Sequence, residues 1–547
     1  MNGAEFIAKS LKNFGVEFVS TLCGNGLHLL YPELVKAGIR LIDVRHEQAA
    51  AYIADTYARS TGKVGVCVVS SGVAHSMALS GLVNSHFDRA PVLLITGASS
   101  GYGCGMGVFQ EFDQVKLASP VCKYSEAVAS AEELAFKLKQ ALSLALTGTP
   151  GPVHLTVPEN VLRDEVGCTV LKPSVSEGFS HLGQIGEWAL GEVVELLDRS
   201  SRPLLIIGGN LFYCGREAAE EVLRFSKTFS VPFMVPIWDR GVVEEPSENF
   251  LGVIGAASGA PRILDDVDLV ILVGARVDYR IGFLKPPYVR EDVRVVRVDV
   301  DAQQLFQGIE PDVPVLADPN ATFRRIRDEA LRRGVQPKRD WLSEARGRYL
   351  AFRRRFESVP DEVEGKLTGK GLVEAIKPFT KDTLFLVDGG NIGQWVHVLA
   401  DVYPRSWITC GASGVVGWGL PGAVGAKLAY PEKDVLLLSG DGAFGFTLGE
   451  LYTAIKHDVN FVSVVAVDEA WGIVVSSQKR LVGEDGVIAS YLPNIRYDRV
   501  AEAFGAKGFF AEDATSVREA IMEGFKCGKP AVIHVPIAWG GPRDLAR

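Results

Sequence analysis

The sequence predicts an α/β protein built from three doubly wound parallel sheets. Short apolar runs rich in β-branched residues alternate with longer helical patterns, which is typical of parallel strands joined by crossover helices. The pattern recurs along a chain of 547 residues, a length that suggests about three domains. We expect domains at 1–165, 185–335 and 365–547, with a polar linker near 166–184 and a charged, partly helical linker near 335–365.

Each expected domain contains several candidate buried strands. They are Leu41–Val44, Val64–Val69, Val92–Thr96 and Val153–Val157 in the first domain; Leu204–Ile207, Phe233–Val235, Leu269–Val273 and Val293–Val298 in the second; and Leu384–Val387, Val435–Leu438 and Phe461–Val467 in the third. Helical patterns follow at His75–Val83, Ile185–Leu197 and Thr447–Ile455.

Composition excludes several classes of protein. The net charge is −9 and no basic stripe is interleaved with aromatic residues, which argues against a nucleic-acid partner. The eight cysteines are scattered without a CxxC pair, which argues against a disulfide scaffold or a structural zinc site. The first helical pattern lacks the apolar core of a signal peptide, and no apolar run reaches the roughly 18 residues of a membrane span. We therefore expect a cytoplasmic protein.

The strongest motif is Gly440-Asp441-Gly442-Ala443, which directly follows the expected strand Val435–Leu438. Open α/β sheets bind ligands at the carboxyl ends of their strands, where glycines let the backbone approach a phosphate and a helix N-terminus favours its charge. An aspartate in such a turn can hold Mg²⁺, which prefers oxygen ligands and bridges phosphates. Asp468 ends the next expected strand, so both carboxylates could reach one ion.

This constellation resembles the signature of thiamine-diphosphate-dependent enzymes. The resemblance implies that Asp441, Asp468 and the backbone carbonyl of Ala470 hold Mg²⁺, with Gly440, Gly442 and Ala443 beside the cofactor. The family usually has asparagine where Asp468 stands. A carboxylate oxygen is also a hard ligand, so we expect metal binding to survive this change.

A second motif is Arg45-His46-Glu47, which opens an alanine-rich helix. Taken alone, Glu47 is an ordinary first-turn acid that the helix dipole favours. The resemblance implies a different role, in which a carboxyl kept protonated by an apolar pocket hydrogen-bonds to N1′ of the cofactor. That contact favours the tautomer whose 4′-imine takes the proton from the thiazolium carbon.

Two further stretches resemble family segments around the cofactor. In Cys410–Gly422 the Gly414 carbonyl would accept from the 4′-amino group and Val416 would sit between the two rings, although the glycines could equally serve close packing. After Leu384–Val387, the amides of Asn391 and Ile392 would bind the diphosphate. Asp388 could instead cap the following helix.

The substrate side departs from the family pattern. His75 follows a stretch where the family often has Ser-Gly-Pro-Gly, and it is either a polar active-site group or a satisfied, partly buried histidine. Gln110 lies in Phe109-Gln110-Glu111, which resembles acetolactate synthases, and could hydrogen-bond to the substrate carboxylate. Ser477 replaces the tryptophan found in synthases that prefer a larger acceptor. Residues Lys479–Ser490 resemble a mobile closing loop.

The resemblance covers nearly the whole chain as pyrimidine-binding (1–165), middle (185–335) and diphosphate-binding (365–547) domains. In this family the middle domain holds FAD, holds ADP, or is empty. Asp299 and Asp301 could bind a ribose or merely end a strand in water. Because Glu47 of one subunit meets the metal site of another in the family, a homodimer or homotetramer is implied.

The leading hypothesis is an acetolactate-synthase-like enzyme that decarboxylates a 2-oxo acid and transfers the remaining acyl unit to a carbonyl acceptor. The alternatives are a 2-hydroxyacyl-CoA lyase or oxalyl-CoA decarboxylase relative, which the short tail after Val532–Val535 disfavours, and a simple 2-oxo acid decarboxylase. A non-catalytic cofactor-binding paralogue is a further alternative. A nucleotide-dependent dehydrogenase is disfavoured because Ile207-Gly208-Gly209-Asn210 is a poor dinucleotide-binding turn.

Overall fold

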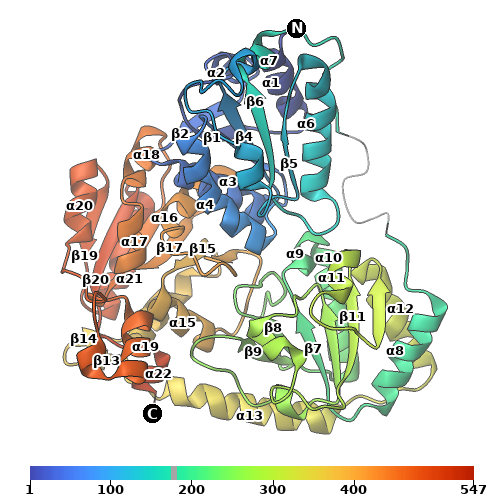
Figure 1. Cartoon of the computed structure of the whole chain (residues 1–547). Coiled ribbons are helices and arrows are strands. Elements are labelled where there is room, and N and C mark those ends of the chain that lie inside the picture. The colour runs from blue at the N-terminus through green and yellow to red at the C-terminus, as the bar shows by residue number, and fades with distance from the viewer. Residues whose placement is uncertain (174–181, 547) are drawn as a thin grey trace.

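The computed structural model describes residues 1–173 and 182–546, so residues 174–181 of the expected first linker lie outside it. The described chain contains three six-stranded sheets whose strand pairs are all parallel, and helices cover their faces (Figure 1). This confirms the predicted α/β class with three doubly wound parallel sheets.

The first sheet has the strand order β2-β1-β3-β4-β6-β5. Its strands are β1 Phe18–Leu22, β2 Arg40–Asp43, β3 Gly65–Val69, β4 Val92–Ala98, β5 Tyr124–Ala127 and β6 Val153–Pro158. The main helices around it are α1 Gly3–Asn13, α3 Glu47–Thr61, α4 Val73–Asp88 and α6 Ala131–Leu146.

The second sheet has the order β12-β11-β10-β7-β8-β9. Its strands are β7 Pro203–Ile207, β8 Phe233–Pro236, β9 Phe250–Ile254, β10 Leu269–Val273, β11 Arg294–Asp299 and β12 Val313–Leu316, with helices α8 Glu187–Arg199, α10 Arg216–Phe229 and α12 Pro319–Arg332.

The third sheet repeats the topology of the first, with the order β16-β15-β17-β18-β20-β19. Its strands are β15 Leu384–Asp388, β16 Trp407–Thr409, β17 Val435–Gly440, β18 Val462–Val467, β19 Lys507–Phe510 and β20 Ala531–Pro536. Helices α14 Gly369–Ile376, α15 Gly390–Leu399, α16 Gly419–Ala429, α17 Asp441–Phe446, α18 Glu450–Lys456, α19 Gly472–Val482, α20 Tyr497–Phe504 and α21 Ala514–Lys526 accompany it, and α22 Pro542–Leu545 ends the chain.

The strand order of the third sheet creates a crevice between β15 and β17. The chain leaves β15 toward β16 on one side and returns to β17 on the other, so the connections after these two neighbouring strands depart in opposite directions. Such a switch point is where open α/β sheets bind ligands, at the carboxyl ends of the strands.

The first and third domains share one buried apolar core, in which α3 packs against α16. The interface also contains a buried charge cluster. Arg59 of α3 pairs with Asp88 at 3.1 Å and Asp55 at 3.5 Å, and Trp418 donates to Asp55 at 3.2 Å. Arg59 donates to the carbonyl of Thr409 at 2.8 Å, which ties the first domain to β16.

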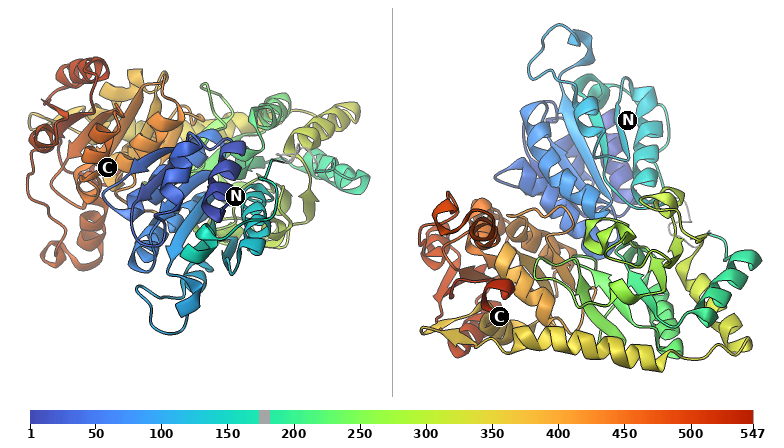
Figure 2. Two further views of the ribbon diagram at one scale, coloured as in Figure 1. Left: turned by 90° about the horizontal axis from the view of Figure 1, so that it is seen from above. Right: turned by 60° about the horizontal axis from the view of Figure 1, so that its bottom comes forward.

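The expected second linker contains the long helix α13 Arg339–Glu357 and the strand β13 Glu362–Val363, which forms a short hairpin with β14 Lys366–Leu367 just after the linker. In Figure 1 and in the right view of Figure 2, the helix α13 runs along the lower edge of the molecule, from the middle domain to the C-terminal domain. The two domains are therefore connected by a long helix and not by an unstructured segment.

One helix prediction was wrong in its start. In place of one helix from Thr447 to Ile455, α17 begins at Asp441 itself, and α18 follows after a break. The sequence pattern placed the start later because Gly442 and Gly445 weaken the apolar periodicity within this first helix.

Candidate active site

Three helices begin at one cavity on the carboxyl edge of the third sheet. α15 begins at Gly390 after β15, α17 at Asp441 after β17, and α19 at Gly472 after β18. In none of the three does the side chain of the N-cap residue accept a hydrogen bond from the first turn. Their first-turn residues line a cavity of about 270 Å³. Free amide N–H groups and helix dipoles that converge in this way favour an anion such as a diphosphate.

Two buried aspartates lie at the same cavity. Asp441 Oδ2 accepts from the backbone N–H of Glu469 at 2.9 Å, and its Oδ1 accepts from Gly442 at 2.8 Å. Burial raises the pKa of Asp441 to about 6, and burial together with the charge of Asp441 raises the pKa of Asp468 to about 7. A cation between these carboxylates would relieve both effects, so the pair suits a divalent metal.

The backbone at the cavity supplies the remaining features of a metal and diphosphate site. Ala470 is buried on the cavity wall, and no described residue donates a hydrogen bond to its carbonyl oxygen. Across the described residues no cluster of three or more His, Cys, Asp or Glu side chains could hold a metal. A metal at Asp441 and Asp468 would therefore need ligands such as this carbonyl and the oxygens of a bound phosphate.

Glycine is required at two positions around the cavity. Gly389 has a φ of +115°, and a Cβ there would lie 2.8 Å from the backbone nitrogen of Gly440. A Cβ on Gly472 would lie 2.0 Å from Asn391 Nδ2 and 3.0 Å from Asp468 Oδ2. Asn391 Nδ2 and Asp468 Oδ2 thus lie close together on the side of Gly472 where a Cβ would stand.

The structure brings the predicted C-terminal site residues together at this one cavity. Its lining includes Asn391, Ile392, Gly414, Val416, Gly440, Asp441, Gly442, Ala443, Asp468 and Ala470. It also includes Trp471, Ile473, Val474 and Ile537, which the sequence analysis did not select as site residues. Trp471 to Val474 come shortly after Asp468 in the sequence. Their position after the strand β18 could therefore have indicated that they lie at the site. Ile537 follows β20, and only the strand order brings it to the site.

The expected cap role of Asp388 was wrong. Its Oδ2 accepts from the backbone N–H of Gly419 at 2.6 Å, which is the first residue of α16 and not of the following helix α15. Asp388 is the last residue of β15, and its buried side chain points to a neighbouring segment. Burial raises the pKa of Asp388 to about 6.

Glu47 lies away from this cavity within the same chain. It is the first residue of α3, with His46 as the N-cap, and it is half-buried. Glu47 does not line the cavity of the third sheet. The described chain therefore does not itself bring the predicted activating carboxylate to the two aspartates.

His75 and Gln110 lie at the carboxyl edge of the first sheet, near each other in the fold but in different surroundings. Gln110 is half-buried and its Oε1 accepts from Ser71 Oγ at 2.9 Å. His75 is fully buried against the ring of His154, at 4.7 Å between ring centroids. Neither ring nitrogen of His75 has a hydrogen-bond partner among the described residues, and burial lowers its pKa to about 4. His75 is therefore more deeply buried than the partly buried histidine that the sequence suggested, and its ring nitrogens lack the hydrogen bonds that a satisfied histidine would have.

Charged side chains crowd the crevice at the carboxyl edge of the middle sheet. Arg240, Arg276 and Arg280 of the middle domain meet Arg59 and Arg89 of the first domain there, around a cavity of about 40 Å³. That volume has room for only a few water molecules. A flavin or an adenine nucleotide does not fit this crevice as it stands.

The carboxylates of Asp299 and Asp301 both accept hydrogen bonds from other residues of the chain. Asp299 is buried and accepts from Asn210 Nδ2 at 3.2 Å, so the expectation that it could end a strand in water was wrong. Asp301 caps α11 Ala302–Phe306 through the backbone of Gln303 and also accepts from Thr149. Both carboxylates therefore fix the chain around the crevice.

The expected closing loop is partly helical. Residues Lys479–Val482 form the last turn of α19, and Glu484–Gly486 form a short 3₁₀ turn. The backbone N–H of Trp471, just before α19, donates to the carbonyl of Ser490 at 2.8 Å, which fixes the end of the segment beside the start of this helix. Ser477 lies half-buried on α19 and does not line the cavity of the third sheet.

Comparison with known proteins agrees with these three sheets. Three family models match: the N-terminal thiamine pyrophosphate (TPP) binding domain of thiamine pyrophosphate enzymes at residues 1–117, their central domain at 190–326 and their C-terminal TPP binding domain at 388–535. The chain belongs to the thiamine pyrophosphate enzymes.

Within that class the chain is similar to acetolactate synthases over nearly all of its length. It is 26% identical to a probable acetolactate synthase large subunit of Methanocaldococcus jannaschii, over 98% of this chain and 92% of that protein. It is 28% identical to the acetolactate synthase isozyme 1 large subunit of Escherichia coli, over 98% and 94%. It is 29% identical to the acetolactate synthase large subunit of Lactococcus lactis, over 92% and 87%. The chain is thus a thiamine-pyrophosphate-dependent enzyme of the acetolactate synthase type.

In residues 1–173 and 182–546, no helix has both the length and the apolar character needed to cross a bilayer.

Proposed function

We propose that the chain decarboxylates a 2-oxo acid and joins the remaining acyl unit to a second carbonyl compound, with Mg²⁺ and thiamine diphosphate bound at the cavity of the third sheet. The observation that carries the proposal is the convergence of three uncapped helix N-termini and two buried aspartates on that cavity. The former favour the diphosphate and the latter favour the metal.

Asp441, Asp468 and the carbonyl of Ala470 would hold the Mg²⁺, and the amides of Asn391 and Ile392 would hold the diphosphate. The first turn of α15 has no N-cap side chain, which leaves these backbone amides open to a ligand and supports this assignment. Gly440, Gly442 and Ala443 would keep the backbone close to the phosphate oxygens. When bound, the cofactor supplies a thiazolium carbon that adds to a carbonyl and accepts the electrons released by loss of CO₂.

Val416 and Gly414 would contact the middle of the cofactor. Both line the cavity, and Gly414 has a φ of +67° that turns the chain sharply there. We propose that the Gly414 carbonyl accepts a hydrogen bond from the 4′-amino group and that Val416 separates the two rings.

We infer that Glu47 of a second copy completes the site, which makes the working form a homodimer or a homotetramer. The position of Glu47 away from the cavity of its own chain supports this assignment. Its carboxyl would hold a proton at N1′ of the pyrimidine ring. Gln110 would donate from its side-chain amide to the substrate carboxylate. His75, packed against His154, would support the first domain from within and would not touch the substrate.

The substrate assignment comes from the relatives, which are named as acetolactate synthases. Pyruvate is therefore the proposed donor, and the acceptor is a small carbonyl compound. Simple decarboxylation, the CoA-dependent reactions and a non-catalytic role stay predictions, as do a cytoplasmic location and domain limits at 165, 185, 335 and 365. The crowded middle crevice gives no support to bound FAD or ADP.

The test is to incubate the protein with thiamine diphosphate, Mg²⁺ and pyruvate, and to follow CO₂ and acetolactate together. Glu47→Gln is the variant and Glu523→Gln, an exposed residue on α21, is its control. Acetolactate formation that collapses only in Glu47→Gln supports the proposal. CO₂ without acetolactate would indicate a simple decarboxylase, and absence of both products with intact cofactor binding would contradict pyruvate as donor.

A further inference from the structure

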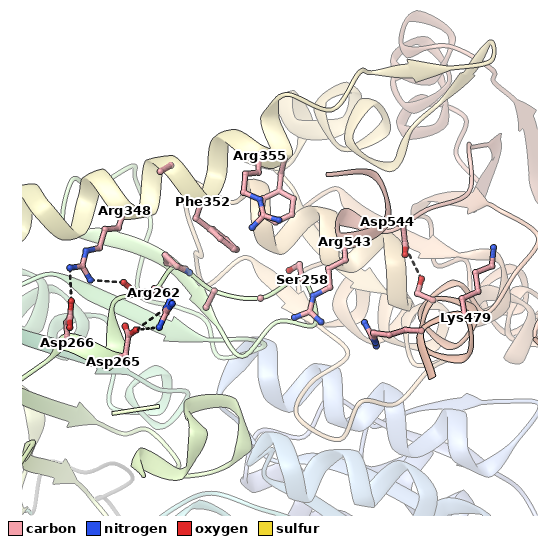
Figure 3. A pocket seen from close by; sticks show the side chains of 17 residues that line it. Ser258, Arg262, Asp265, Asp266, Arg348, Phe352, Arg355, Lys479, Arg543 and Asp544 are labelled. Carbon is pink, nitrogen blue, oxygen red and sulfur yellow. Dashed lines mark hydrogen bonds and ion pairs between the residues drawn. The ribbon is translucent and has the colours of Figure 1, made fainter. Parts of the chain in front are cut away.

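A second and larger cavity lies beside the cofactor cavity, between three parts of the chain. The loop that follows β9, the C-terminal half of α13 and the helices α19 and α22 surround it, and its volume is about 1240 Å³ (Figure 3). Ligand sites for small molecules usually have volumes of several hundred to about 1,000 Å³. This cavity is therefore large enough for a ligand of nucleotide size.

The cavity is positively charged although the whole chain carries −9. Six cationic and three acidic side chains line it. Each acid already has a partner: Asp265 pairs with Arg262 at 3.1 Å, Asp266 pairs with Arg348 at 2.7 Å, and Asp544 accepts from Ser476 at 2.8 Å. Figure 3 shows these three pairs as dashed lines.

Three arginines at the cavity remain without an acid. Arg355 of α13, Arg480 of α19 and Arg543 of α22 form no ion pair with any residue that the structure describes. They come from three separate elements, and all three side chains are exposed. Arginine is suited to phosphate because its planar guanidinium can donate two parallel hydrogen bonds.

An aromatic and apolar wall lies next to these cations. Phe352 of α13 is half-buried at the cavity, beside Ala260 and Pro261 of the loop. A Cβ on Gly259 would lie 3.7 Å from Arg543 Nη2 and 3.8 Å from a ring carbon of Phe352. A cation and an exposed ring edge therefore meet at one end of the cavity. Such a pairing suits a ligand with both phosphates and a flat ring.

We propose that this cavity binds an organic polyphosphate that carries a flat ring, of the adenosine-phosphate type. Arg355, Arg480 and Arg543 hold its phosphates, and Phe352 contacts its ring. Free adenine nucleotides and coenzyme A share this chemistry, and they differ in the thiol-bearing arm that only coenzyme A has. The inference goes beyond the proposed reaction and does not depend on it.

Two helices, α15 and α19, connect this cavity to the cofactor cavity. The first turn of α19 lines the cofactor cavity at Ile473 and Val474, and its later turns line the second cavity at Lys479 and Arg480. On the opposite wall, Ser258 donates to Gln394 of α15 through its backbone N–H at 3.1 Å, and α15 begins at the cofactor cavity. A ligand held here is thus placed to alter how the cofactor is bound.

The test is isothermal titration of the holoenzyme, with thiamine diphosphate and Mg²⁺ kept saturating so that the diphosphate site is closed to competitors. The probes are ADP, coenzyme A and inorganic pyrophosphate. The variants are Arg543→Ala, Arg355→Ala and the triple change that also includes Arg480→Ala. Arg354→Ala is the matched control, because Arg354 is exposed on α13 but does not line the cavity.

We expect the wild type to bind ADP or coenzyme A more tightly than pyrophosphate, with an affinity that falls as salt is added. Each single arginine change should weaken binding about tenfold, as expected for a charge-assisted hydrogen bond, and Arg354→Ala should not change it. Tighter binding of coenzyme A than of ADP would identify a thioester carrier as the ligand, and equal binding would identify a free nucleotide.

Three results would overturn the proposal: no binding of either adenosine compound at millimolar concentration, binding that the triple variant retains, or pyrophosphate that binds as tightly as both. Because titration does not require turnover, failure of pyruvate as substrate would leave this result unaffected.

Discussion

The carboxylate of Asp441 accepts a hydrogen bond from the backbone N–H of Glu469, with 2.9 Å between Oδ2 and the nitrogen. Asp441 follows β17, and Glu469 follows β18 and stands next to Asp468. The contact ties the ends of two adjacent parallel strands and fixes both aspartates at one point. This arrangement makes a shared metal ion the simplest account of the pair.

The first prediction concerns Asp468. We expect Asp468→Asn to keep metal-dependent cofactor binding within about tenfold of wild type, because an amide oxygen is still a hard ligand. Asp468→Ala should weaken binding at least about 100-fold, since loss of a direct ligand should exceed the cost of losing an outer contact. Equilibrium binding of thiamine diphosphate at fixed Mg²⁺ measures both. Asp434→Asn, at the opposite end of β17, is the control. Equal losses in Asn and Ala variants would contradict a ligand role.

Much of the site was predictable from sequence because it depends on local patterns. An apolar strand followed by Gly-Asp-Gly identified Asp441, and the next strand identified Asp468. The structure also brings Asn391 and Val416 to the same cavity. These residues lie at strand ends or in glycine-rich turns, and chain order alone places them near the carboxyl edge of a parallel sheet.

Other features depend on packing that no local pattern reveals. Ile537 reaches the cavity only because β20 pairs with β18. The complete burial of His75 against His154 joins residues far apart in the chain. The crowding of Arg89 and Arg240 in the middle crevice requires two domains to meet. The fold class was predictable because the spacing of apolar residues along the chain determines it. These contacts were not predictable, because they depend on which distant elements pack together.

Glu450 of α18 provides a prediction about pH. Its carboxylate accepts from the backbone of Arg45 at 3.1 Å and from Thr453 at 2.6 Å, and burial raises its pKa from 4.5 to about 7. An acid whose pKa is raised on folding contributes stability below about 4.5, and this contribution is lost as the pH rises through about 7. Glu450→Gln should therefore gain stability over wild type at pH 8.5 relative to pH 5.5, by on the order of 2 kcal/mol, because part of the effect is already present at pH 5.5.

Denaturant unfolding at the two pH values measures this effect. Glu523→Gln, exposed on α21, should show no such difference. A gap between Glu450→Gln and wild type that is the same at both pH values would contradict the raised pKa.

Arg59 provides a prediction about the interface between the first and third domains. It is buried and neutralises Asp55 and Asp88. Arg59→Ala would leave two buried carboxylates without a cation, so we expect a loss of about 3–5 kcal/mol in the free energy of unfolding. Arg163→Ala removes only an exposed pair with Glu159 and should cost less than about 1 kcal/mol. Equal losses in the two variants would show that the buried cluster contributes little.

The proposal that two copies of the chain share each site leads to a complementation experiment. Glu47→Gln and Asp441→Ala should each abolish acetolactate formation as homodimers. A mixed dimer would contain one site with both residues intact, because each chain supplies what the other lacks. A one-to-one mixture that exchanges freely should recover about a quarter of wild-type activity. No recovery in a mixture shown by mass spectrometry to contain mixed dimers would contradict a site formed by two chains.

The most direct test of the central claim is titration of the metal-free protein with thiamine diphosphate, with and without Mg²⁺. The geometry of Asp441, Asp468 and the Ala470 carbonyl predicts tight binding only with Mg²⁺, loss of that binding on addition of EDTA, and no metal-dependent binding in Asp441→Ala. Binding of equal strength without a divalent metal, or in Asp441→Ala, would contradict the assignment of this cavity as the metal and diphosphate site.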